Sequence, residues 1–196
     1  TAVDADAGAT LTWSVVGTPD ATYGTFMISP SGTWTYTLDN LDDDTQKLNE
    51  GDSVTLDFLV QVSDGLPGGT VQETVKITIS GTNDSPTVKE ALVDTVAEGA
   101  TPALVVDLLE GASDVDDGEA ATLKVINPTV QFSVNGGAAS ASLPAGAVLS
   151  IDNKTLTVDA TSSIFNSLAV TQTATIVISY QVQDVKDAVV SQTATI

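Results

Sequence analysis

The sequence contains no cysteine, no histidine and no arginine among its 196 residues. Without cysteine it can form neither disulfides nor thiolate metal sites. Without all three it also lacks the usual general base, thiol nucleophile and anion clamp of enzymes. Paired carboxylates could still hydrolyse a glycoside, but no two of them stand out as a catalytic pair. We therefore expect a protein without enzymatic activity.

Positive charge is also scarce, because six lysines stand against 26 acidic residues and leave a net charge of -20. A surface that binds nucleic acid or an anionic membrane needs clustered basic residues, so we expect neither partner. Asp outnumbers Glu by 20 to 6, and the short Asp carboxylate suits turns and oxygen cages around cations. Cations are therefore the expected partners.

No apolar run approaches the roughly 18 residues of a membrane-spanning helix, and the start of the chain has no signal-peptide pattern. Hydrophobic residues nevertheless make up 42% of the chain, mostly Val, Leu, Ile and Ala, with abundant Thr. This composition is typical of half-buried strands and suffices for two ordinary cores, so we predict an all-β fold. Both ends of the sequence fall within expected strands, which we interpret as the cut ends of a longer chain.

Alternation of apolar and polar residues predicts strands throughout the chain. In the first half the alternating segments are 11–15, 23–28, 33–38, 54–64 and 75–79. In the second half they are 123–126, 130–134, 148–151, 155–158, 174–182 and 191–196. Trp34, Tyr36 and Leu38 share one face of their strand, which favours a place in a sandwich core. The alternative is an exposed platform of Trp13, Tyr23, Trp34 and Tyr36 that stacks on a carbohydrate or another partner.

The two halves repeat one another weakly. Residues 56–64 match residues 176–184, and each segment is an alternating strand that ends in Asp. The pair Asp4 and Asp6 likewise matches Asp114 and Asp116. A period above 100 residues indicates whole domains in tandem. We predict two Greek-key β-sandwiches end to end, an N-terminally truncated one over 1–84 and a second over 85–196.

The six residues Gly81-Thr82-Asn83-Asp84-Ser85-Pro86 separate these halves. Asn and Asp favour turns and offer hard oxygen ligands, while Pro86 lacks a backbone N–H and should end a strand. The segment is either a metal-binding hinge or an ordinary turn between domains. An EF-hand loop at 113–119 is excluded, because taking Asp114 as its first ligand places Glu119 where that loop needs Gly.

Several segments of the first half, in order, resemble a VCBS repeat, a unit of large bacterial surface adhesins of the RTX type. They are Tyr23–Phe26, Ile28–Asn40, Glu50–Thr55, Val60–Gly65 and Ile77–Pro86. Residues 87–196 are similar to cadherin-like or bacterial immunoglobulin-like repeats. The resemblance implies a calcium-stiffened extender segment, exported by a type I system, that projects a terminal adhesive domain from the cell surface in attachment or biofilm formation.

The same resemblance implies where calcium is held. The ligands would be Asn83 and Asp84 of the linker, Asp114 and Asp116 of the Asp-x-Asp turn, Asp184 at a strand end, and Glu50 from the preceding domain. Asp4, Asp6 and Asp64 would form the equivalent pole of the first domain. Expected partners are calcium ions and neighbouring repeats, with weak self-association through edge strands. The alternative function is a carbohydrate- or protein-binding β-sandwich module of a secreted bacterial protein.

Overall fold

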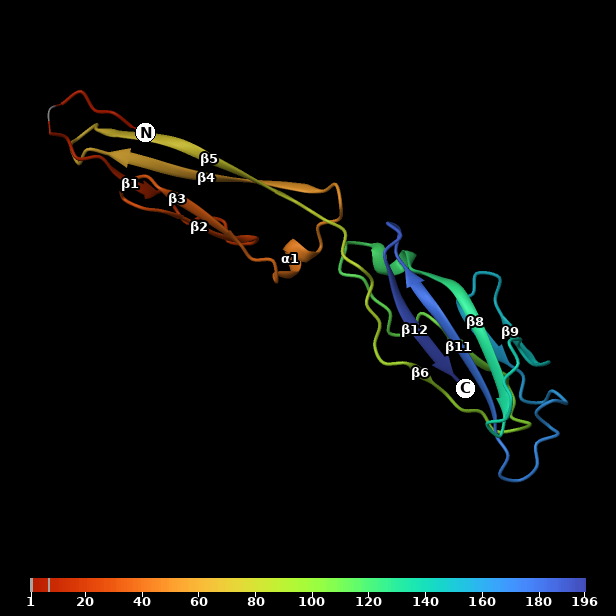
Figure 1. Cartoon of the computed structure of the whole chain (residues 1–196). Coiled ribbons are helices and arrows are strands. Elements are labelled where there is room, and N and C mark those ends of the chain that lie inside the picture. The colour runs from red at the N-terminus through yellow and green to blue at the C-terminus, as the bar shows by residue number, and fades with distance from the viewer. Residues whose placement is uncertain (1, 7) are drawn as a thin grey trace. The chain divides into compact units, whose positions relative to one another are not determined.

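The computed structural model describes residues 2–6 and 8–196. The chain forms two compact units, Thr1–Asn83 and Asp84–Ile196 (Figure 1). Strands dominate both, and the helical elements among the described residues are one turn of α-helix, α1 (Asp43–Gln46), and one turn of 3-10 helix, η1 (Glu119–Thr122). The predicted all-β fold is confirmed. No helix of the described residues is long and apolar enough to cross a membrane.

The described residues of the first unit form five strands in two antiparallel sheets. They are β1 (Thr12–Val15), β2 (Gly24–Ile28), β3 (Trp34–Leu38), β4 (Ser53–Ser63) and β5 (Thr70–Ser80). One sheet has the order β1-β4-β5, and the other is the hairpin β2-β3. The long β4-β5 hairpin is yellow-orange in Figure 1. Alternate residues of β4 point inward, so Leu56, Phe58, Val60 and Val62 are buried.

The core of the first unit lies between these two sheets. Phe26 of β2 stacks on Phe58 of β4 with ring centroids 4.4 Å apart. Tyr36 of β3 also contacts Phe58, with centroids 5.8 Å apart. Trp34 and Leu38 lie on the same face of β3 but remain exposed. Their expected burial is therefore wrong, because β3 is an edge strand and, among the described residues, no strand pairs beside it to shield these side chains.

The second unit is a seven-stranded sandwich. Its strands are β6 (Leu92–Val93), β7 (Leu104–Asp107), β8 (Lys124–Val134), β9 (Ala147–Leu149), β10 (Thr155–Val158), β11 (Ala174–Gln183) and β12 (Val189–Thr195). The sheets have the orders β6-β12-β11-β8 and β7-β10-β9. The chain crosses between them from β6 to β7, from β7 to β8, from β8 to β9 and from β10 to β11, which is the predicted Greek-key arrangement. β6 pairs in parallel with β12, and the other pairings are antiparallel.

The centre of the core of the second unit is shielded from solvent. Leu156 of β10 and Ile178 of β11 have no exposed surface. The hydroxyl of Tyr180 on β11 donates to the carbonyl of Leu108, just after β7, at 2.7 Å. This buried bond joins the two sheets, and burial raises the pKa of the Tyr180 hydroxyl to about 12.

Candidate metal centre

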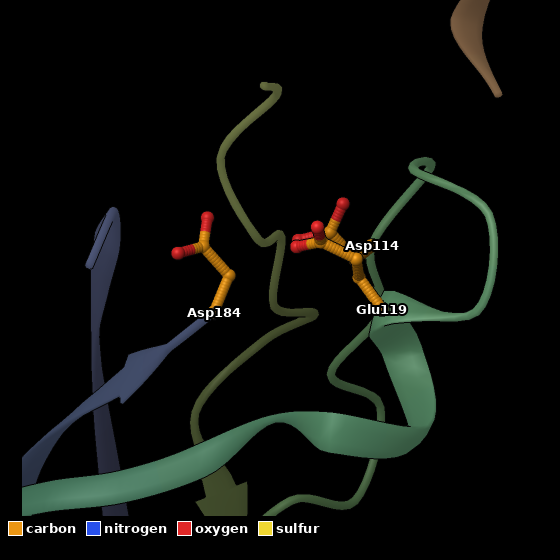
Figure 2. A group of neighbouring side chains, drawn as sticks. All are labelled: Asp114, Glu119 and Asp184. Carbon is orange, nitrogen blue, oxygen red and sulfur yellow. The ribbon is translucent and has the colours of Figure 1, made fainter. Parts of the chain in front are cut away.

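Three carboxylates of the second unit converge on one point (Figure 2). Asp114, Glu119 and Asp184 each place one carboxylate oxygen within 4.8 Å of the others. Glu119 is 7% exposed and Asp184 is 1% exposed. Asp114 lies in the segment between β7 and η1, Glu119 is the first residue of η1, and Asp184 directly follows β11. Residues from two distant parts of the sequence therefore meet at one end of the sandwich.

Two more carboxylates, those of Asp84 and Asp116, lie near this group. The backbone N–H of Asp84 donates to Oδ2 of Asp116 at 2.8 Å, and Asp116 is 2% exposed. The charges of Asp84, Asp116 and Asp184 all act on the carboxyl of Asp114. We call Asp84, Asp114, Asp116, Glu119 and Asp184 the acidic cluster.

Backbone pairing brings the start of the second unit to the Asp114 turn. The N–H of Thr87 donates to Ser113 O at 2.7 Å, and the N–H of Ser113 donates back to Thr87 O at 2.9 Å. The two hydroxyls are also 2.9 Å apart. This short bridge follows buried Pro86 and holds Asp84 beside the turn.

A glycine turns the chain from Asp116 to Glu119. Gly118 adopts φ +77°, a left-handed conformation that side chains other than Gly rarely take. The turn lets the N–H of Glu119 donate to the carbonyl of Asp116 at 3.2 Å and begins η1. Glu119 thereby returns over the Asp-x-Asp turn with its side chain buried.

Asp184 is fixed by the hairpin between β11 and β12. Its Oδ1 accepts hydrogen bonds from the backbone N–H groups of Lys186 and Ala188, each at 2.8 Å. Its own N–H donates to the carbonyl of Ala188 at 3.1 Å. The carboxylate is therefore oriented by the turn that it closes.

Oxygens of the acidic cluster are buried without hydrogen bonds. Asp114 Oδ2, Asp116 Oδ1 and Glu119 Oε2 are inaccessible to solvent and have no hydrogen-bond partner. In both Asp residues a backbone N–H holds the other oxygen: Asp116 N–H donates to Asp114 Oδ1 at 3.1 Å, and Asp84 N–H to Asp116 Oδ2. Burying charged oxygens without a partner costs several kcal/mol. A cation is the partner that these oxygens fit.

The pKa values of the acidic cluster also favour a bound cation. The pKa values of Asp114, Asp116 and Glu119 are all raised, first because burial disfavours the charged form and then because neighbouring carboxylates repel. The positive charge of Lys186 acts against this rise at Asp116 and Glu119. An all-oxygen, strongly anionic ligand set suits a hard cation such as Ca²⁺, whereas Zn²⁺ favours nitrogen and sulfur.

Four of the residues expected from the sequence are brought together here: Asp84, Asp114, Asp116 and Asp184. Glu119 was missed, since the sequence argument used its position only to exclude an EF-hand. The signal was present in Asp-Gly-Glu at 117–119, where a glycine turn directs the Glu back toward the preceding Asp residues. Its burial could not be read from spacing alone.

The other expected ligands lie in the first unit. Asn83 is half-buried, and Glu50 is exposed in the turn before β4. Asp4 Oδ1 accepts from the N–H of Asp6 at 2.8 Å, and Asp64 Oδ1 accepts from the N–H of Leu66 at 2.9 Å. These bonds are turn-forming, and ligand roles for the five residues stay predictions.

The first unit does not reproduce the acidic cluster. Within residues 2–6 and 8–196, no second group of three carboxylates brings its oxygens within 4.8 Å. Ala9 follows Gly8 where Glu119 follows Gly118. The pole of the first unit therefore lacks the Glu that completes the group in the second.

No family model and no curated protein matches this sequence. Among solved structures it is similar to cadherin extracellular regions. Protocadherin gammaB4 gives a TM-score of 0.46 at 12% identity over 95% of this chain and 27% of that chain. Mouse cadherin-23 EC22-24 gives 0.42 at 19% identity, over 100% and 55%. Drosophila N-cadherin EC1-4 gives 0.39 at 14% identity, over 94% and 39%. The chain thus spans from about a quarter to about half of the length of these structures.

Proposed function

We propose that this chain is a calcium-stiffened extender segment of a large bacterial surface adhesin of the RTX type. In this role it projects a terminal adhesive domain from the cell in attachment or biofilm formation, and it has no catalytic task. The observation that carries the proposal is the set of buried carboxylate oxygens without hydrogen bonds on Asp114, Asp116 and Glu119.

Calcium would act on the segment with which the second unit begins. Without the ion, the carboxylates of the acidic cluster repel one another. With the ion, Asp116 is held in its charged form and continues to accept the N–H of Asp84. The segment from Asp84 to Thr87 is then fixed to the sandwich at the cluster and at the Thr87–Ser113 bridge. The ligand roles of Asn83 and Glu50, implied by the resemblance, belong to the same proposal.

The adhesin context is supported by the resemblance of residues 23–86 to a VCBS repeat. The net charge of -20 also fits a chain that stays unfolded where calcium is low and folds where calcium is abundant. We therefore place the protein outside the cell, on the bacterial surface, after export by a type I system.

Small-angle scattering of chelator-stripped protein, with and without calcium, tests the stiffening. We expect the maximum interatomic distance and the radius of gyration to increase when calcium is added to the wild-type protein. Neither quantity should change on addition of calcium to Asp116→Asn. Asp117→Asn is the matched control, because Asp117 is exposed and lies next to the cluster without belonging to it. If calcium binds but leaves the scattering unchanged, the extender role is contradicted while the metal centre stands.

One observation favours the alternative of a binding module. Trp34 is exposed although it stacks on Phe26, with ring centroids 5.9 Å apart. An exposed indole can stack on a sugar ring. Protection of tryptophan from acrylamide quenching by added oligosaccharides would support the binding module. Unchanged quenching across a panel of sugars would leave the extender as the better account.

A further inference from the structure

We propose that the second unit binds a neutral saccharide in a hollow on the outward face of β8, β11 and β12. The hollow has a volume of about 390 Å³. Its outward-facing side chains carry only amides and hydroxyls, and they belong to Asn127, Ser179, Gln181, Ser191 and Thr193. These residues are neither in the acidic cluster nor in the first unit, so the inference is independent of the metal centre and of Trp34.

An irregularity of β8 shapes this hollow. Two residues of β8, Asn127 and Pro128, lie opposite the single residue Tyr180 of β11, because the register shifts between Ser179 and Gln181. Asn127 takes φ +50°, a left-handed conformation that Asn adopts more readily than most residues. An extra residue of this kind redirects a side chain, and such bulges are frequent next to functional sites. Here the bulge brings the side chain of Asn127 to Gln181.

The two amides form a hydrogen-bonded pair. Nδ2 of Asn127 donates to Oε1 of Gln181 at 3.0 Å. Asn127 is exposed and Gln181 is half-buried. Every amide side chain has an oxygen that accepts and a nitrogen that donates. The pair therefore orients both groups and still offers a ligand the acceptor Oδ1 of Asn127 and the donor Nε2 of Gln181.

Hydroxyl groups continue the hollow across the sheet. Ser179 of β11 pairs with Thr193 of β12, and Gln181 pairs with Ser191. Neighbouring strands lie about 4.8 Å apart, so side chains that are directly opposite follow one another at this spacing. The spacing is comparable with the width of one sugar ring. Because each hydroxyl both donates and accepts, the row matches the hydroxyls of a saccharide.

The charge of the face narrows the class of ligand. Of the outward positions that the structure describes on β8, β11 and β12, only Lys124 is charged, and it pairs with Gln183 at one end of the sheet. The whole chain carries a net charge of -20. An acidic polymer would be repelled by this chain and would find no cation in the hollow, and a metal ion would find no carboxylate there. A neutral ligand that both donates and accepts hydrogen bonds remains.

The form of the hollow also predicts weak binding. Its volume falls within the roughly 300–1,000 Å³ of small-molecule sites. It is open along the sheet, which suits a segment of a longer chain of sugars. The ring of Tyr180 is buried in the core, so no aromatic side chain of the lining stacks on a sugar. Hydrogen bonds that replace bonds to water give little net affinity, so we expect a Kd on the order of 1 mM.

NMR titration of the calcium-loaded full chain tests the proposal. The probes are maltohexaose, mannohexaose and galactohexaose, with hexagalacturonate as the acidic counterpart. We expect saturable changes in the backbone amide shifts of residues 127, 179–181 and 191–193 with at least one neutral hexasaccharide. Hexagalacturonate should leave the same amides unchanged.

Two variants of the hollow separate ligand binding from folding. Gln181→Glu keeps an acceptor for Asn127 Nδ2 but replaces the donor Nε2 with a carboxylate oxygen, and it should weaken binding at least about fivefold. Ser191→Ala removes one hydroxyl from an exposed side chain, so it should weaken binding without affecting the core. Gln131→Glu is the matched control, because Gln131 is exposed on the same face but does not line the hollow. It should bind as the wild type does.

Four results would overturn the proposal. The first is the absence of shift changes in the hollow with every neutral hexasaccharide. The second is equal affinity in Gln181→Glu and Gln131→Glu. The third is binding of hexagalacturonate as tight as that of the neutral sugars. The fourth is a set of shifts that changes with protein concentration when no sugar is present, which would make a second copy of the chain the occupant of the face.

Discussion

Asp84 and Asp116 are joined by a 2.8 Å hydrogen bond from the backbone N–H of the first to Oδ2 of the second, across 32 positions of sequence. The bond fixes the first residue of the second unit to the turn that holds the acidic cluster. It also uses one oxygen of Asp116 and leaves the other, Oδ1, buried without a hydrogen bond. The same side chain therefore anchors the chain and offers a ligand.

Substituting Asp116 should release this anchor. In Asp116→Ala the amide of Asp84 loses its acceptor, so its hydrogen exchange should speed up while exchange in β8, β11 and β12 stays slow. Both cores should remain folded, since Asp116 contributes no apolar surface to them. Native-state hydrogen exchange measured by NMR in the presence of calcium makes the test, with Asp117→Ala as control. Equal loss of protection in all strands would show that Asp116 supports the whole fold instead.

The calcium-free protein should show an unusual pH dependence. Because the pKa values of Asp114, Asp116 and Glu119 are raised in the folded state, the folded unit holds more protons than the unfolded chain between about pH 4 and those raised values. The free energy of unfolding therefore falls as the pH rises through this window.

Calorimetric unfolding of the second unit in chelator tests this sign. Acidification toward about pH 4 should raise its unfolding temperature. Added calcium should reverse the trend, because calcium binds the deprotonated carboxylates. A calcium-free unit that loses stability on acidification over the same range would contradict the assignment.

The hydroxyl of Tyr180 should contribute to the stability of the second unit. Tyr180→Phe removes the donor to Leu108 O and leaves a buried carbonyl without its partner. We expect a loss of about 1–3 kcal/mol in the free energy of unfolding. Urea unfolding followed by circular dichroism measures it. Tyr23→Phe is the control, because Tyr23 belongs to the first unit, and a loss common to both variants would contradict the specific role of the buried bond.

The sequence predicts the central strands well because each carries its own pattern. In β11, Ile176, Ile178, Tyr180 and Val182 alternate and are all buried. By contrast, β6 has only two residues, and it is a strand because it pairs with residues 194 and 195 a hundred positions later. No local pattern encodes such a strand, and β6 and β7 were both missed.

Two further differences have local causes. The predicted strands 123–126 and 130–134 are one strand, β8, which continues through Asn127 and Pro128. Asn127 takes φ +50°, and the register with β11 shifts at this point, so the strand passes the proline as an irregularity without ending. Trp34 and Leu38 lie on the same face of β3, as predicted, but both side chains are exposed. Their burial depends on neighbouring strands, which the pattern within one strand does not reveal.

The sequence predicts only part of the acidic cluster. The weak repeat between the two halves of the sequence identifies three of its residues, Asp114, Asp116 and Asp184. Each lies in a turn and has an Asp at the matching position of the first half. Glu119 has no counterpart in the first unit, and its inclusion depends on the conformation of Gly118. The spacing of Asp-Gly-Glu at 117–119 indicates a turn, but the burial of the Glu119 side chain depends on how that turn packs.

Calorimetric titration of chelator-stripped protein shows whether the acidic cluster binds calcium. We predict saturable calcium binding to the wild-type chain and a loss of affinity of at least about tenfold, or about 1.4 kcal/mol, in Glu119→Gln. Glu110→Gln should bind as the wild type does, because Glu110 is exposed and outside the cluster. Absence of calcium binding, or equal affinity in Glu119→Gln and the wild type, would contradict the account.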